Sequence, residues 1–170
     1  MSTTEHKEGA PKIVNCKVIT VSDTRNKDTD KSGKLMIELL EQAGHAIVDY
    51  VIVKDEAAPI KEAILQGCEH GDIDVILTNG GTGIAKRDVT IESVQSLLDK
   101  EIVGFGELFR MLSYQEDIGS AAILSRAIAG VVKNKGVFST PGSTGAVKLA
   151  MNKLILPEIG HVVREIKKDL

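Results

Sequence analysis

Strand-like and helix-like segments alternate along the first hundred residues, and this alternation restricts the fold more than any other feature. Each apolar, strand-like run is followed by a segment with helical spacing. The successive pairs are residues 13–21 and 33–43, residues 46–53 and 59–68, and residues 73–78 and 90–98. A βαβαβα order predicts an α/β protein with a parallel sheet covered by helices.

The second half of the chain extends this pattern. Residues 102–114 and 118–131 carry helical spacing, residues 136–139 predict another strand, and residues 144–156 predict the next helix. A final helix is expected after Pro157, because proline suits the first position of a helix. With 170 residues, of which 42% are hydrophobic, the chain is expected to form one domain over residues 13–170. Residues 1–12 are polar and predict a disordered tail.

Composition argues against several classes of function. A net charge of -3 and 3% aromatic residues argue against a nucleic-acid surface or an anionic membrane surface. Cys16 and Cys68 lie in apolar runs and are interpreted as buried thiols in a reducing compartment. The four histidines are scattered, which disfavours a zinc site. No apolar run approaches the length of a membrane span, so a cytoplasmic protein is expected.

A glycine-rich run follows the third predicted strand and precedes a predicted helix. It consists of Thr78, Asn79, Gly80, Gly81, Thr82 and Gly83. Glycines allow positive φ and let an anion approach backbone N–H groups without meeting a Cβ, and the next helix adds its positive end. The run matches neither the P-loop nor the dinucleotide fingerprint. A plain turn is the alternative, and nearby Asp88 could serve only as a helix cap.

Polar residues also follow the other predicted strands. Ser22 and Asp23 come after the first strand, Asp55 after the second, and Pro141-Gly142-Ser143 after the strand at residues 136–139. Parallel strands share one carboxyl edge, so these loops are expected to converge with the glycine-rich run on one crevice. Each has a structural alternative, since Ser22 and Asp23 could form a turn, Asp55 could open a helix and Ser143 could cap one.

Several of these motifs together resemble the MoaB/MogA family of molybdenum-cofactor biosynthesis proteins, and MoaB-type members in particular. The motifs are Val21-Ser22-Asp23, the glycine-rich run, Arg87-Asp88-Val89-Thr90, Gly104-Phe105-Gly106-Glu107, Leu124-Ser125-Arg126 and Thr140-Pro141-Gly142-Ser143. The resemblance spans nearly the whole chain after residue 12. It implies a three-layer α/β/α fold that binds molybdopterin, a pterin dithiolene with a terminal phosphate, and it implies a homotrimer or homohexamer.

Catalytic members of this family transfer AMP from Mg-ATP to that phosphate before molybdenum insertion. By resemblance Asp55 and Asp88 match acidic positions important for catalysis, and both are assigned to the region that holds Mg²⁺ and the nucleotide. The resemblance assigns the pterin and its phosphate to Ser22, Asp23, the run Thr78 to Gly83, Glu107, Ser113, Pro141, Gly142 and Ser143. Glu107 and Arg110 are spaced i, i+3 and could instead form a surface pair, and Ser113 could be a helix-end hydroxyl.

Three hypotheses follow from the sequence. The chain is a molybdopterin adenylyltransferase, a non-catalytic molybdopterin-binding or scaffold protein of the same pathway, or an unrelated nucleotide-binding α/β enzyme. Asp55 and Asp88 favour the enzyme, and the incomplete dinucleotide fingerprint disfavours the third hypothesis. Its expected partners are molybdopterin, ATP and other proteins of molybdenum cofactor biosynthesis.

Overall fold

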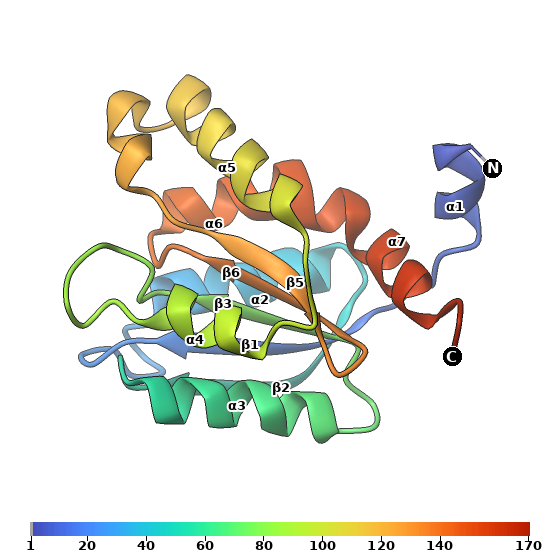
Figure 1. Cartoon of the computed structure of the whole chain (residues 1–170), viewed down its shortest axis with the longest axis horizontal. Coiled ribbons are helices and arrows are strands. Elements are labelled where there is room, and N and C mark those ends of the chain that lie inside the picture. Colours follow the sequence, from blue (N-terminus) through green and yellow to red (C-terminus); the bar gives the residue numbers. More distant parts are fainter. Residues whose placement is uncertain (1) are drawn as a thin grey trace.

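A computed structural model describes residues 2–170, apart from the side chain of His6, and shows one six-stranded sheet between two layers of helices (Figure 1). The strands run in the order β2-β1-β3-β6-β5-β4. Their bounds are β1 (Asn15–Val21), β2 (Ala46–Val53), β3 (Val75–Asn79), β4 (Lys100–Glu101), β5 (Ile128–Val132) and β6 (Lys135–Thr140). Strands β1, β2, β3 and β6 pair in parallel, and β5 is antiparallel to both of its neighbours. The predicted fold class, a three-layer α/β/α domain with a mostly parallel sheet, is confirmed.

Two hydrophobic cores lie on the two faces of the sheet. Along β1, Cys16 and Val18 point to one core, while Ile19 and Val21 point to the other. Helices α2 (Lys31–Gln42), α5 (Val103–Glu116), α6 (Thr144–Ala150) and α7 (Leu156–Lys167) cover the first face, and α3 (Ala57–Glu69) and α4 (Thr90–Leu97) cover the second. Each fully buried Val, Leu, Ile or Met contributes about 1.5–3 kcal/mol of transfer free energy, so packing on both faces fixes the position of every strand except β4, whose two residues are exposed. Within residues 2–170, the helices fall short of the length and hydrophobicity that a membrane span requires.

The helix predicted over residues 118–131 is wrong. That segment forms a 3₁₀ helix, η1 (Gly119–Leu124), and then strand β5, which turns directly into β6. The hairpin turn holds Lys133 and Asn134 at φ 47° and 63°, in the left-handed region that such turns require. A continuous apolar run does not distinguish a buried strand from a buried helix, and Lys133 gives no glycine signal for the turn.

The last two predicted helices are joined in the structure. A π-helical turn, η2 (Met151–Ile155), connects α6 to α7 without a break. Pro157 lies at the first turn of α7 and has no N–H to donate, and its ring crowds the carbonyl four residues earlier. The wider π turn lies where this crowding would fall, so the helix continues past the proline.

The N-terminal segment carries a helix in the structure. Helix α1 (Thr3–Glu8) begins with a capping box between Ser2 and Glu5. Lys7 forms an ion pair of 2.6 Å with Glu158 of α7, and α1 lies beside α7 in Figure 1. Part of the segment expected to be disordered therefore has a defined contact with the domain.

Candidate functional site

The loops after β1, β2, β3 and β6 meet at the carboxyl edge of the sheet around a cavity of about 620 Å³. Most of the predicted site residues line this cavity. They are Ser22, Asp55, Gly80, Gly81, Thr82, Gly83, Asp88, Pro141, Gly142 and Ser143. The structure therefore brings together loops as far apart in sequence as Ser22 and Ser143, as the parallel topology predicts.

The glycine-rich loop has a backbone that other residues could not adopt. Gly80 and Gly81 have φ of 101° and 67°. A Cβ on Gly80 would lie 2.2 Å from the carbonyl oxygen of Val21, and one on Gly81 would lie 2.3 Å from Oγ1 of Thr90. That hydroxyl donates a hydrogen bond of 2.9 Å to the Gly80 carbonyl. The loop is thus held tightly against β1 and the start of α4, with its backbone open to the cavity.

Asp55 and Asp88 lie beside this loop. If Gly81 carried a Cβ, this atom would lie 3.0 Å from Oδ1 of Asp55. A Cβ on Gly83 would lie 2.6 Å from Oδ2 of Asp88. Burial raises the pKa of Asp55, and the charges of Asp23 and Asp88 raise it further. The predicted acidic pair is therefore brought together.

The capping alternative for Asp88 is wrong. Helix α4 begins after Val89, which occupies the N-cap position and has an apolar side chain. Asp88 instead accepts a hydrogen bond of 2.9 Å from the N–H of Ala85 and so closes the loop on itself.

Asp23 is turned toward Arg87. The guanidinium donates to both carboxylate oxygens, from Nε at 2.7 Å and from Nη2 at 3.0 Å, and the N–H of Asp55 donates to Oδ1 at 3.1 Å. These bonds, with that from Arg87 foremost, lower the pKa of Asp23. The pair ties the loop after β1 to the loops after β2 and β3.

Thr78 and Asn79 lie beneath the cavity and are fully buried. Thr78 donates to Oγ of Ser139 at 2.8 Å. Asn79 accepts from Ser32 at 2.7 Å and donates to Thr20 at 3.0 Å. Their side chains therefore join β3 to its neighbours, and they support the loop from below.

Ser22 and Ser143 have local structural roles as well as positions on the cavity wall. Oγ of Ser22 accepts hydrogen bonds from the N–H groups of Thr24 and Arg25, which makes the expected turn. Oγ of Ser143 accepts from the N–H of Ala146 at 3.1 Å and caps α6. The turn and cap alternatives are confirmed at these two positions.

Glu107 and Ser113 both lie on α5, outside the set of described residues that line the cavity. Glu107 is exposed, whereas Ser113 is buried under the helix. Their assignment to molybdopterin stays a prediction from the resemblance.

Two arginines on the cavity wall were missed as site residues. Arg25 donates to the Gly142 carbonyl at 2.8 Å, and Arg126 enters from the segment between η1 and β5. Both make bonds to loops far away in sequence. Only Leu124-Ser125-Arg126, one of the motifs that carry the family resemblance, pointed to the segment that holds Arg126.

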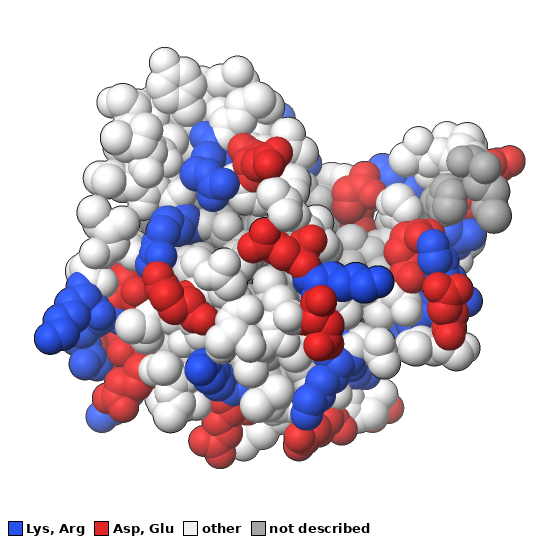
Figure 2. All heavy atoms as spheres, in the orientation of Figure 1, with Lys and Arg blue, Asp and Glu red and all other residues white. Residues whose placement is uncertain are grey.

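One wall of the cavity is apolar and continues onto an exposed surface. Ile118, Ala121 and Leu124 line the cavity. Beyond them Tyr114 and Ile123 are 62% and 83% exposed. Figure 2 shows largely uncharged atoms over this end of α5 and over η1, in contrast to the mixed charges elsewhere on this face. An exposed apolar patch of this kind is typical of an interaction surface.

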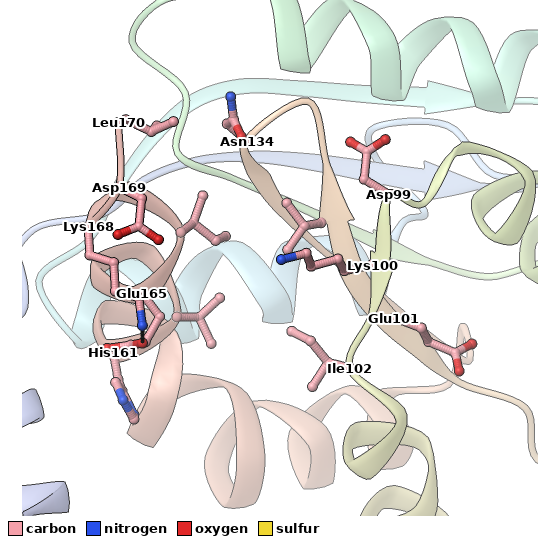
Figure 3. A pocket seen from close by; sticks show the side chains of 13 residues that line it. Asp99, Lys100, Glu101, Ile102, Asn134, His161, Glu165, Lys168, Asp169 and Leu170 are labelled. Atoms are coloured by element: carbon pink, nitrogen blue, oxygen red, sulfur yellow. Dashed lines mark hydrogen bonds and ion pairs between the residues drawn. The ribbon is translucent and has the colours of Figure 1, made fainter.

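A second cavity, of about 580 Å³, lies at the opposite edge of the sheet. It is lined by the end of α7, by β4 and by the β5–β6 turn (Figure 3). Side chains of both charges surround it, among them Lys100, Glu101 and Lys168. Lys168 forms an ion pair of 2.7 Å with Glu165.

Donor chemistry at the first cavity suits Mg²⁺ carried by a nucleotide. Among the described residues, no three His, Cys, Asp or Glu side chains are placed to hold a metal ion by themselves. Mg²⁺ commonly takes only one or two protein carboxylates and completes its shell with substrate phosphates and water. Asp55 and Asp88 provide such oxygens, and a cation beside them would offset the burial and the neighbouring negative charges that raise the pKa of Asp55.

Comparison with known proteins identifies the protein family. Residues 17–161 match the family described as "Probable molybdopterin binding domain". The molybdenum cofactor biosynthesis protein B of Bacillus subtilis is 67% identical over 99% of both chains. A crystal structure of a molybdenum cofactor biosynthesis protein B has a TM-score of 0.91 at 65% identity, covering 94% of this chain and 99% of that one. The tungsten cofactor synthesizing protein MoaB from Pyrococcus furiosus has a TM-score of 0.83 at 41% identity, covering 93% and 99%.

The chain therefore belongs to the molybdopterin-binding-domain family, among relatives named molybdenum cofactor biosynthesis protein B. This confirms the family that the sequence motifs indicate.

Proposed function

We propose that this protein acts in molybdenum cofactor biosynthesis, binds molybdopterin at the carboxyl edge of its sheet, and adenylylates the terminal phosphate of molybdopterin with Mg-ATP. The observation that carries the proposal is the placement of Asp55 and Asp88 beside an open glycine-rich backbone in one cavity. Family membership and the names of the relatives support the pathway.

In the proposed reaction a phosphate oxygen of molybdopterin attacks the α-phosphorus of ATP. A new P–O bond forms to this phosphorus, its bond to the β-phosphate oxygen breaks, and pyrophosphate leaves. The protein must hold two polyanions in line and offset the charge that develops between them.

The chain has groups suited to both tasks. Backbone N–H groups of Gly81 and Gly83 can donate to phosphate oxygens, and the capped N-terminus of α6 presents further donors beside Ser143. Asp55 and Asp88 would hold the Mg²⁺ of the nucleotide, which neutralises phosphate charge. The apolar wall at Ile118, Ala121 and Leu124 offers a surface for the pterin ring.

The direct test is to incubate the purified protein with molybdopterin and Mg-ATP and to search by mass spectrometry for adenylylated molybdopterin. We expect product and pyrophosphate with the wild-type protein and none when Mg²⁺ is chelated, with Asp88→Asn as the site control. Molybdopterin that binds without any product would contradict the transfer and favour the alternative, a non-catalytic binding or scaffold protein of the same pathway.

We further propose a homo-oligomer, a trimer or a hexamer, that covers the exposed apolar surface of α5 and η1. Burial of side chains such as Tyr114 and Ile123 would provide the driving force. Sedimentation at micromolar concentration should give a mass that is a multiple of the 18.2 kDa chain mass. The Ile123→Lys variant should sediment with a smaller mass than the wild-type protein. A wild-type monomer would contradict this proposal.

A further inference from the structure

Arg126 holds the glycine-rich loop from its carbonyl side. Its Nε donates to the carbonyl oxygen of Thr82 at 3.0 Å, and its Nη2 donates to that of Gly83 at 2.6 Å and, less closely, to that of Asp88 at 3.4 Å. The residue lies just before β5, more than forty positions along the chain from Thr82 and Gly83. A single planar guanidinium thus binds the last two residues of the glycine-rich run and Asp88, at the two ends of residues 82–88.

These bonds set the orientation of two peptide planes. In a trans peptide the N–H points opposite to the carbonyl of the preceding residue. With the carbonyls of Thr82 and Gly83 directed at Arg126, the N–H groups of Gly83 and Ile84 are directed away from it. The same bonds engage carbonyl oxygens whose negative partial charge would repel an anion near the loop. Arginine suits this role because its donors form a rigid fork, whereas lysine offers a single point charge.

The charge of Arg126 is already matched by a neighbour. Glu92 of α4 pairs with Nη1 and also accepts from Nη2 at 3.3 Å. The guanidinium therefore adds little net charge to the cavity, and its effect on a ligand is mainly geometric.

We propose that Arg126 is a positioning residue that fixes the glycine-rich loop in its anion-binding conformation. The inference rests on the proposed function, because it assigns the ligand of that loop to phosphate-bearing molecules. Arg126 acts through the backbone of Thr82 and Gly83, whereas Glu92 only matches its charge.

The test compares Arg126→Lys, Arg126→Gln and Glu92→Gln in the full chain. Binding of molybdopterin and of Mg-ATP is measured by calorimetry, and urea unfolding reports the fold. We expect both Arg126 variants to weaken the binding of at least one ligand about tenfold or more, because carbonyl contacts are lost in each. Glu92→Gln should change binding less than about threefold, because the contacts from Arg126 to the backbone remain.

A second readout follows the loop itself. Backbone amide NMR shifts of Gly83 and Ile84 in the unliganded protein should move in both Arg126 variants and stay near their wild-type values in Glu92→Gln. A merely structural residue would change the unfolding midpoint and leave ligand affinity of the folded protein and these shifts unaltered.

Each contrary outcome is distinct. Wild-type affinity in Arg126→Lys with loss only in Arg126→Gln would show a role for charge alone and overturn the proposal. Loss of the fold in both Arg126 variants would assign Arg126 to the framework of the domain and also overturn it. A wild-type protein that binds neither ligand would remove the proposed function, while the amide shifts would still show whether Arg126 sets the loop.

Discussion

The two cavities of this protein lie at opposite edges of one sheet and have similar volumes, about 620 and 580 Å³, but they are built from different groups. The first is lined mainly by loops that follow parallel strands, and its lining includes Gly80, Gly81, Gly83 and Gly142. The second is formed by side chains of α7, β4 and the β5–β6 turn, as Figure 3 shows. Volume alone therefore does not identify a ligand site.

The difference comes from strand direction. At the carboxyl edge the chain leaves each strand and enters a helix, so free N–H groups and helix N-termini point to one place. At the other edge Asp99 accepts from the N–H of Lys133 at 2.8 Å, and Lys168 pairs with Glu165. Glycines line the first cavity, whereas the lining of the second holds none among the residues described, so only the first matches the proposed site for a polyanion.

The largest expected contrast between the two edges is in catalysis. Asp88→Asn should reduce the proposed adenylyl transfer on the order of 100-fold or more, because the side chain loses its charge beside the loop where the nucleotide would bind. Asp169→Asn, at the second cavity, is the matched control and should leave the rate unchanged. The measurement is the initial rate of product formation by mass spectrometry, and full activity in Asp88→Asn would remove this residue from the mechanism.

Backbone geometry at the first cavity gives the next largest effect. Gly81→Ala should lower the free energy of unfolding by more than about 2 kcal/mol, because positive φ and the contact with Thr90 act together. Gly44 also has a positive φ, of 89°, but a methyl group added there would meet open space. Gly44→Ala should therefore lower the free energy of unfolding by only about 1–2 kcal/mol. Urea unfolding measures both, and equal losses would show that the contact with Thr90 is easily relieved.

Ser143 separates a structural role from binding. Ser143→Ala should cost about 1 kcal/mol of stability because the cap of α6 is lost, while Ser143→Gly should cost only about 0.3 kcal/mol. If the hydroxyl also contacts molybdopterin, both variants should bind it more weakly by a similar factor. Weaker binding in the alanine variant alone would trace the effect to the cap.

The smallest effect concerns pH. The pKa of Asp55 is raised in the folded protein, so the folded state holds this proton more tightly than the unfolded chain does. The protonated carboxyl therefore stabilises the folded state at pH values below the ordinary pKa of 3.8. This contribution is lost as pH rises through the pKa of Asp55 in the folded protein. Asp55→Asn should therefore unfold at a higher urea concentration than wild type at pH 7, with a gain that shrinks toward pH 4.

Asp23 is the control, because its pKa shifts in the opposite direction to that of Asp55. Its pKa is lowered by Arg87, so its stabilisation is present above 3.8 and is lost as pH falls through the folded value. Asp23→Asn should unfold at a lower urea concentration than wild type at pH 7. A shift of the same sign in both variants would contradict the assigned interactions.

The sequence by itself determined the class of fold and the convergence of the polar loops on one cavity. The alternation of strand-like and helix-like runs required a parallel sheet, and the parallel sheet required the polar loops after its strands to meet at one edge. The spacing of apolar residues and the composition of a loop are set by residues close together in sequence. Both can therefore be recognised without the tertiary structure.

Only the tertiary structure decided which side chains reach the cavity. Strand β3 is buried along its whole length, so no polar–apolar alternation indicated that Thr78 and Asn79 bond inward to β1, α2 and β6. The apolar run at residues 128–132 became a strand because it pairs with β6 and β4, although its pattern also fits a helix. Arg126 reaches Thr82 and Gly83 only after the chain has folded, because contacts between residues so distant in sequence depend on how the whole sheet packs.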